Sequence, residues 1–312
     1  MLKLIQNEWM KLWRKKGTWA MLIILILVII GPGILVKYYE SQNTDERTWQ
    51  EIEQENIAMN KETLASEDIN DGDTAFFEEQ IAISEYRLAN NLPTQIGESL
   101  EGFISNGISL FILVTLFTVI TAASIVSSEF STGTIKMLLT RPVSRLKILT
   151  SKLLTVFLFG LLLIVVNLCM SAITGAVLFG PASGVELELV KGEFVEKAIG
   201  SDLAYTALLS CGDFIMSTLF AFLVGSVFRS SSLAIGLTMF LSFTGSMIVM
   251  FLSKYDFVKY IWITHSDLTQ HQNKNFIVEG ITMPLSLTVL SVYAILFLVI
   301  SYTTFIKRDV TA

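Results

Sequence analysis

The chain has 312 residues, of which 52% are hydrophobic and 16% are charged, and its formal net charge is −6. A soluble domain carries about a quarter charged residues, so this composition, with a mean hydropathy of +0.61, excludes an ordinary soluble globular protein. Cys169 and Cys211 both lie inside apolar runs. We therefore expect small packing residues there, and no disulfide framework or CxxC metal site.

Residues 1–16 predict an amphipathic helix at the membrane interface, with its basic residues largely off the apolar stripe. The stripe consists of Leu2, Ile5, Trp9, Leu12 and Trp13. The alternative is that these residues are the ordinary start of the first membrane span. Residues 17–36 are too apolar over too long a stretch for a signal peptide, and no small-residue cleavage site follows them. We expect a retained transmembrane helix, which Gly31-Pro32-Gly33 should kink or end.

Residues 37–102 form the one sizeable polar insert, and sixteen of them are Asp or Glu. Apolar residues recur at helical spacing within Thr48–Leu64 and within Phe77–Leu88, with the turn signal Asn70-Asp71-Gly72-Asp73 between them. We predict an outward acidic helical hairpin that packs on the membrane part or on a second copy, because it is too small to have much core of its own. Its acidic turn lacks the spacing of a calcium-binding EF-hand.

Six apolar runs are long enough to cross a membrane, since about 20 residues of helix span the hydrocarbon core. They are Trp19–Val36, Phe103–Val126, Leu153–Phe179, Leu203–Phe228, Leu233–Leu252 and Pro284–Ile306. Residues 103–312 thus hold transmembrane helices 2–6. The predicted fold class is an all-α integral membrane protein with six transmembrane helices, the N-terminal interfacial helix, and the outward hairpin between helices 1 and 2.

Charge placement predicts the orientation. Lys and Arg gather before the first span, between the second and third spans, at Arg229 and at Lys307-Arg308, whereas 37–102 and 181–202 are acidic. By the positive-inside rule, every connector agrees with a multi-pass protein of the bacterial plasma membrane whose termini are both cytoplasmic.

The connector between the second and third spans carries a short amphipathic helix. Thr134 can cap a helix over Ile135–Thr140, Gly133 supplies the turn before it, and Pro142 ends it. Its apolar residues lie on one face, which needs a groove on the bilayer surface or on a cytoplasmic partner. Periodicity alone leaves both open.

Two polar residues inside spans form a possible intramembrane polar site. Asp213 lies in the fourth span and would contact a cation or a polar substrate, or else sit near the outer surface or hydrogen-bond within the bundle. Asn167 in the third span can join helices by hydrogen bonding. His265 and His271 lie in 253–283, where we expect one or two short interfacial helices. They have no partners at ligand spacing, so we expect surface or interfacial histidines and no metal site.

The connector resembles a known pattern. The order Glu129…Gly133-Thr134…Leu138-Leu139…Pro142-Val143-Ser144-Arg145…Lys152 is similar to the E…GT…LL…P-x-S/A-R…K pattern of ABC-2 type permeases, the membrane subunits of ATP-binding cassette exporters. The resemblance implies a cytoplasmic coupling helix within 127–147, seated in a cleft of a separate ATPase. The ATPase-coupling set that it implies is Glu129, Gly133, Thr134, Leu138, Leu139, Pro142 and Arg145. The long acidic hairpin departs from many members, so the cargo stays open.

The sequence contains no GxxxxGK[ST] phosphate loop, so we expect no cofactor on this chain, with ATP and Mg on a partner ATPase. The expected function is the permease subunit of an ATP-driven exporter of an amphipathic compound, such as a peptide antibiotic, a drug or a lipid. The chain would not be an enzyme, would bind no nucleic acid, and would pair with a second copy or a homologous permease. The alternatives are an ion-driven carrier or channel, a membrane sensor that uses the outer hairpin, and an intramembrane enzyme, for which Asp213 lacks a partner in its span.

Overall fold

The computed structural model describes residues 1–42, 47–65, 71–94, 97–131, 133, 143–181, 187–190, 193–196, 199–273 and 276–307. The chain divides into two compact units. Unit 1 comprises Met1–Leu27, Ile108–Asn167 and Thr206–Ala312, and unit 2 comprises Val28–Gly107 and Leu168–Tyr205.

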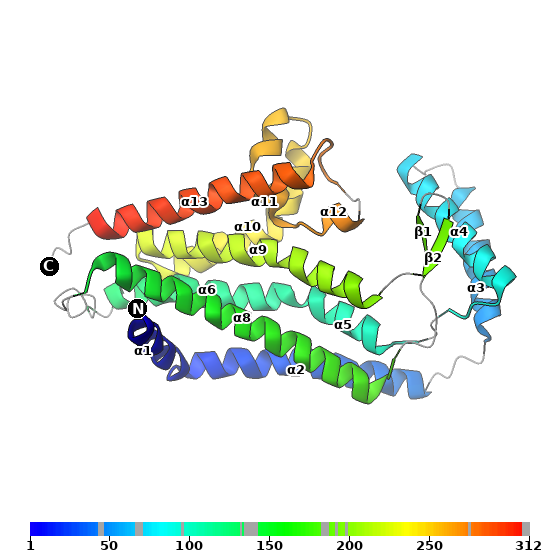
Figure 1. Ribbon diagram of the computed structural model, residues 1–312, viewed down its shortest axis with the longest axis horizontal. Coiled ribbons are helices and arrows are strands. Elements are labelled where there is room, and N and C mark those ends of the chain that lie inside the picture. The colour runs from blue at the N-terminus through cyan, green and yellow to red at the C-terminus, as the bar shows by residue number, and fades with distance from the viewer. Residues whose placement is uncertain are drawn as a thin grey trace. The chain divides into compact units, whose positions relative to one another are not determined.

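Almost all of the described secondary structure is helical (Figure 1). The elements are α1 (Leu2–Trp13), α2 (Lys16–Gln42), α3 (Trp49–Leu64), α4 (Asp71–Asn90), α5 (Leu100–Ser109), α6 (Phe111–Ser131), α8 (Arg145–Leu178), β1 (Leu187–Val190), β2 (Glu193–Glu196), α9 (Ile199–Phe228), α10 (Ser231–Leu252), the 3₁₀ helix η1 (Asp256–Tyr260), α11 (Trp262–Ser266), α12 (Gln270–Asn273) and α13 (Met283–Lys307).

Six helical segments among the described residues are long and apolar enough to cross a membrane, which confirms the predicted spans. They are α2, α5 with α6 (Leu100–Ser131), α8, α9, α10 and α13. The predicted break at Gly31-Pro32-Gly33 does not end a helix, because α2 continues through Pro32 to Gln42. Between α10 and α13 the described residues form three short helices, η1, α11 and α12, where one or two were predicted.

Helix α6 forms the centre of unit 1. In the most apolar window of α5 and α6, 61% of the residues are buried, against 17% in α2 and in α10. Val119 and Ala122 of α6 share one core cluster with Leu149 of α8 and Phe222 of α9. A Cβ on Gly225 of α9 would lie 2.8 Å from the carbonyl oxygen of Ala123. Helices α6 and α9 therefore approach so closely that their backbones touch, as small residues allow in membrane bundles.

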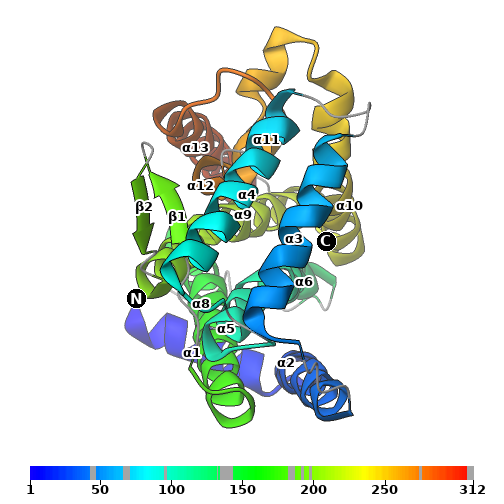
Figure 2. The ribbon, with the colours of Figure 1, turned by 90° about the vertical axis from the view of Figure 1, so that its right-hand side faces the viewer.

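In unit 2, α3 and α4 lie side by side, and the β1–β2 hairpin lies along α4 (Figure 2). Thr48 and Glu51 form a capping box at the start of α3, which satisfies two of the free N–H groups there. The hairpin pairs in antiparallel register, with Leu187 opposite Glu196. These strands were not predicted from the sequence. The sequence signal for β1 is the alternation of apolar and acidic residues in Leu187-Glu188-Leu189. In the structure Leu187 is half-buried and Glu188 is exposed.

The contact between α6 and α9 generates a stability prediction. Gly225→Val should lower the free energy of unfolding in detergent by about 1–3 kcal/mol, because the added carbons must push α9 away from the Ala123 carbonyl. Gly236→Val in α10 is the matched control, because a Cβ there meets nothing within 4 Å. Equal losses for the two variants in denaturant titrations would contradict the close approach of the two helices.

Candidate functional site

Helix α1 contacts the rest of unit 1 through a face that includes a carboxylate. Glu8 and Leu12 are 7% and 5% exposed, whereas Leu2 is 83% exposed. The Thr18 hydroxyl donates to the Leu12 carbonyl oxygen at 2.6 Å, which fixes the turn from α1 into α2. The buried face thus combines Glu8 with Leu12 of the predicted apolar stripe.

The partner of Glu8 is Lys152, on the second turn of α8. The Lys152 side chain is 1% exposed. Its ammonium donates to Glu8 Oε2 at 2.8 Å, to Glu129 Oε1 at 2.7 Å and to the Ile125 carbonyl oxygen at 3.1 Å. A lysine has three N–H donors, so each of them has an acceptor. One side chain therefore joins α1, α6 and α8.

Lys11 completes the group, which we call the charge cluster: Glu8, Lys11, Glu129 and Lys152. The Lys11 ammonium donates to Glu8 Oε1 at 2.8 Å and to Glu129 Oε1 at 3.1 Å. Two ammonium groups thus balance two carboxylates. Buried charges are tolerated only when they are paired and hydrogen-bonded, and the charge cluster meets both conditions.

Within α1, the charged partners of Glu8 and Lys11 favour the ionised form of both side chains. Burial favours the neutral form of Glu8, but Lys152 and Lys11 outweigh it and hold the pKa of that carboxyl below its ordinary 4.5. Burial likewise opposes the charge on Lys11, but Glu8 and Glu129 raise its pKa. For the adjacent Lys15, burial and repulsion from Lys152 outweigh the attraction of Glu8 and Glu129, so its pKa is lowered.

The charge cluster lies at both ends of the predicted coupling segment. Glu129 is two residues before the end of α6, and α8 begins at Arg145, seven residues before Lys152. The Arg145 guanidinium donates to the Ile306 carbonyl oxygen of α13 at 2.9 Å. Each helix that flanks the connector 132–144 is therefore attached to another element close to its connector end.

The structure places three members of the predicted ATPase-coupling set. Glu129 is 8% exposed and belongs to the charge cluster, so its carboxylate faces Lys152. Gly133 has φ +71°, with nothing within 4 Å of the position of a Cβ, which is the left-handed turn predicted before the connector helix. Arg145 bonds α13. The other members, Thr134, Leu138, Leu139 and Pro142, lie outside the described residues.

The two predicted intramembrane polar residues are not joined by a hydrogen bond in the described part of the chain. Asp213 is partly exposed and accepts a hydrogen bond from Ser217, one turn along α9, at 3.2 Å. Ser217 also lies 3.4 Å from the Ser242 hydroxyl of α10. Asn167 is fully buried, and its side-chain amide makes no hydrogen bond with any described residue.

His265 is fully buried, so the expectation of an exposed surface side chain is wrong for this residue. Its Nε2 lies 2.8 Å from the Lys259 carbonyl oxygen, an acceptor, so Nε2 donates. Its Nδ1 then accepts from the Ser286 hydroxyl at 2.8 Å, and His271 Nε2 donates to the same hydroxyl oxygen at 2.9 Å. This neutral network fastens the segment after α10 to the first turn of α13. Among the described residues, no group of His, Cys, Asp and Glu could hold a metal ion.

Glu8 was not among the site residues predicted from the sequence. The signal was present, since Glu8 is the only acidic residue before Glu40 in a strongly basic stretch. A lone carboxylate there needs a cationic partner when its helix packs against the bundle. The identity of the partner could not be read from the chain, because Lys152 is 144 residues away.

Because Lys152 bonds both carboxylates of the charge cluster, we expect its removal to lower the stability of the protein strongly. Lys152→Ala should lower the free energy of unfolding by about 3–5 kcal/mol, because the charge cluster is left with two carboxylates and only the ammonium of Lys11. Lys147→Ala, at an exposed position of the same helix, should change it by less than about 0.5 kcal/mol. Denaturant titration in detergent measures both, and similar values for the two variants would mean that the charge cluster does not hold the helices together.

The histidine network predicts a loss of stability in mild acid. Burial lowers the pKa of His265 and of His271 from the ordinary 6.5, so the unfolded chain binds protons more readily than the folded one. Unfolding free energy should therefore fall as pH drops from about 7.5 to about 5.5, and less so in the His265→Gln, His271→Gln double variant. A melting temperature that rises over this interval would refute the assignment.

Comparison with known proteins gives one family match and two relatives. The family described as "Protein of unknown function (DUF2705)" matches residues 73–311. The "Uncharacterized protein YhcI" of Bacillus subtilis (strain 168) is 36% identical over 315 residues, covering 99% of each chain. The "Uncharacterized membrane protein YdbK" of the same organism is 30% identical over 216 residues, covering 68% of this chain and 84% of the relative.

These matches correct the resemblance to ABC-2 type permeases, which was wrong as a family assignment. The DUF2705 match covers the connector and the five apolar helices after α2, and DUF2705 is a different family. The physical reason is that the residues of the apparent pattern serve local needs. Gly133 makes a left-handed turn, and Glu129 and Lys152 bond each other and α1. With six apolar helices and a relative described as a membrane protein, the chain is a multi-pass membrane protein. The chain belongs to the DUF2705 family.

Proposed function

We propose that the protein is the membrane-embedded subunit of a transporter that a separate cytoplasmic ATPase drives through the connector 132–144. In this proposal both termini and the connector are cytoplasmic, in keeping with the Lys and Arg placement along the chain. The cargo is an amphipathic compound that leaves the cell.

The observation that carries the proposal is the bonding of Lys152 to Glu8 and to Glu129. A short helix that receives a mechanical input is useful only if its flanking helices move as a body. Lys152 connects the end of α6 with the start of α8 and attaches both to α1. A displacement of the connector would therefore reach three helices at once, through a contiguous network of hydrogen bonds and ion pairs.

The interior of unit 1 supports an apolar or amphipathic cargo. The buried residues of α6 and α9 are mostly apolar side chains together with small hydroxyl residues such as Thr118 and Ser217. Polar groups of this kind can hydrogen-bond a neutral head group, whereas ion transport would ask for paired charges inside the spans. The charge cluster lies at the ends of α6 and α8 that flank the connector, so we assign it to positioning the helices.

Affinity purification in mild detergent tests the proposal. The tagged protein, expressed in its own host, should retain an ATPase, and Leu138→Asp should release it, because the change places a charge on the apolar face expected to dock. Ser144→Asp is the matched control, since it adds the same charge at an exposed position after the predicted connector helix, and should leave the ATPase bound.

Two results would contradict the proposal. One is that no nucleotide-hydrolysing protein co-purifies with the wild-type chain under conditions where the chain is folded. The other concerns orientation: in a variant that lacks Cys169 and Cys211, Ser144→Cys should react with a membrane-impermeant maleimide only after the cells are opened, and labelling of intact cells would place the connector outside.

A further inference from the structure

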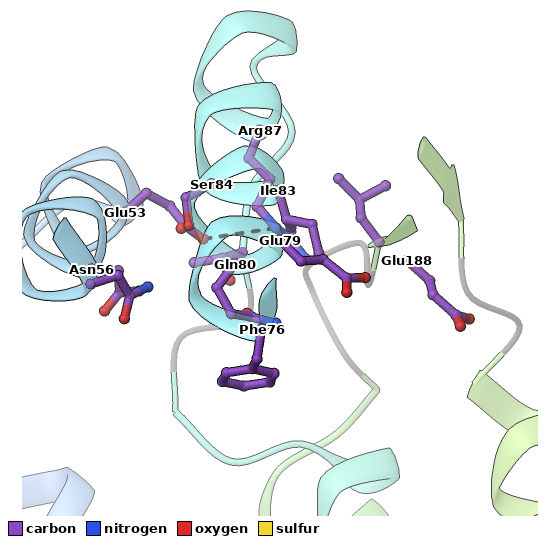
Figure 3. A pocket seen from close by; sticks show the side chains of 12 residues that line it. Glu53, Asn56, Phe76, Glu79, Gln80, Ile83, Ser84, Arg87 and Glu188 are labelled. Carbon is purple, nitrogen blue, oxygen red and sulfur yellow. Dashed lines mark ion pairs between the residues drawn. The ribbon is translucent and has the colours of Figure 1, made fainter. Parts of the chain in front are cut away.

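Unit 2 contains a groove of about 620 Å³ whose lining is mostly polar. Helix α4 forms its floor, α3 forms one wall, and β1 forms the other (Figure 3). The floor residues recur at helical spacing, from Phe76 through Gln80 and Ser84 to Arg87, so one face of α4 is turned into the groove. A volume of this size is typical of pockets for small molecules.

The walls of the groove are fixed by contacts within unit 2. Glu53 of α3 and Arg87 of α4 are 4% and 8% exposed, and Arg87 Nε lies 3.8 Å from Glu53 Oε1. Arg87 also donates to the Pro93 carbonyl oxygen at 3.4 Å. On the other side, Tyr86 of α4 stacks on Phe194 of β2, with 4.1 Å between ring centroids. The groove is therefore held open by its own scaffold, which reduces the entropic cost of binding.

The charge of the groove is negative. Its lining includes the carboxylates of Glu53, Glu79 and Glu188, and Arg87 is its one cation among the described residues. The buried pair with Glu53 uses the charge of Arg87. Glu79 is half-buried on the floor and Glu188 is exposed on β1, and neither makes an ion pair with a described residue. Two carboxylates thus remain for a bound cation.

The hydrogen-bonding groups of the lining suit an organic cation. Asn56 and Gln80 offer amide oxygens as acceptors, and Phe76, which is 56% exposed, offers an aromatic face. Ammonium and guanidinium groups bond carboxylates and amides and also stack on aromatic rings. A metal ion is less well matched, because no described group of three or more His, Cys, Asp or Glu could hold one.

We propose that this groove is a binding site for a small organic cation that carries an ammonium or guanidinium group, with Glu79 as its charge partner on the floor. The site is independent of the transport proposal, because every residue that forms it belongs to unit 2. It gives the acidic insert a recognition role of its own.

Binding to the full-length protein in lipid nanodiscs tests the site by calorimetry. The probes are putrescine and agmatine, and the neutral control is 1,4-butanediol, which has the carbon chain of putrescine without its charges. Both cations should bind and the diol should not. Glu79→Gln should weaken binding by about tenfold, the loss of one charge-assisted hydrogen bond. Glu78→Gln, which removes the same charge at an exposed neighbouring position on α4, should change it by less than about twofold.

A second variant separates the groove from general surface charge. Asn56→Leu should weaken both cations without altering the net charge, because it fills part of the wall with an apolar side chain. The site is refuted if neither cation binds, if the diol binds equally well, or if Glu78→Gln weakens binding as much as Glu79→Gln. Stoichiometric binding of MgCl₂ that is abolished by Glu79→Gln would also overturn it, in favour of a metal site.

Discussion

The arrangement of α1, α6 and α8 depends on one ammonium group. Lys152 is almost fully buried, and its three N–H donors reach Glu8, Glu129 and the Ile125 carbonyl oxygen. Removing a lysine from water costs several kcal/mol, so the site is stable only when all three acceptors are present. α1 therefore cannot leave without taking the Glu8 acceptor from Lys152, and α6 cannot shift relative to α8 without separating Lys152 from Glu129. The helices that flank the connector are thereby constrained as a group.

The sequence predicted the parts of this structure that depend on local composition. The six spans follow from the length of apolar runs, and the left-handed turn at Gly133 follows from the residue type. The parts that it did not predict depend on partners far apart in the chain. Glu8 is an acidic residue in a basic stretch, and its role becomes clear only from its hydrogen bond with Lys152. His265 was expected at a surface and is buried, because Ser286 and the Lys259 carbonyl complete its bonding.

The family assignment shows how local physics can imitate a motif. An acidic residue near the end of α6, a glycine turn and a lysine in α8 each have a structural reason in this chain, since Glu129 and Lys152 bond each other and Gly133 has a positive φ. Their order therefore resembled ABC-2 permeases, although the chain belongs to another family. The proposed function accordingly depends on the mechanical linkage at Lys152 and on the connector, and the acidic insert is assigned a separate recognition role because its groove is built entirely within unit 2.

The central claim is that the charge cluster holds α1 to the two helices that flank the connector. Hydrogen exchange of the protein in nanodiscs, with and without the Glu8→Gln substitution, tests this claim most directly, because exchange reports local opening of individual helices. We predict faster exchange throughout α1 and at the start of α8 in the variant. The exchange rates of α13 should stay unchanged, except in its last turn, which Arg145 of α8 contacts. Unchanged protection of α1 in a correctly folded variant would contradict the account, since α1 would then be held by its apolar contacts alone.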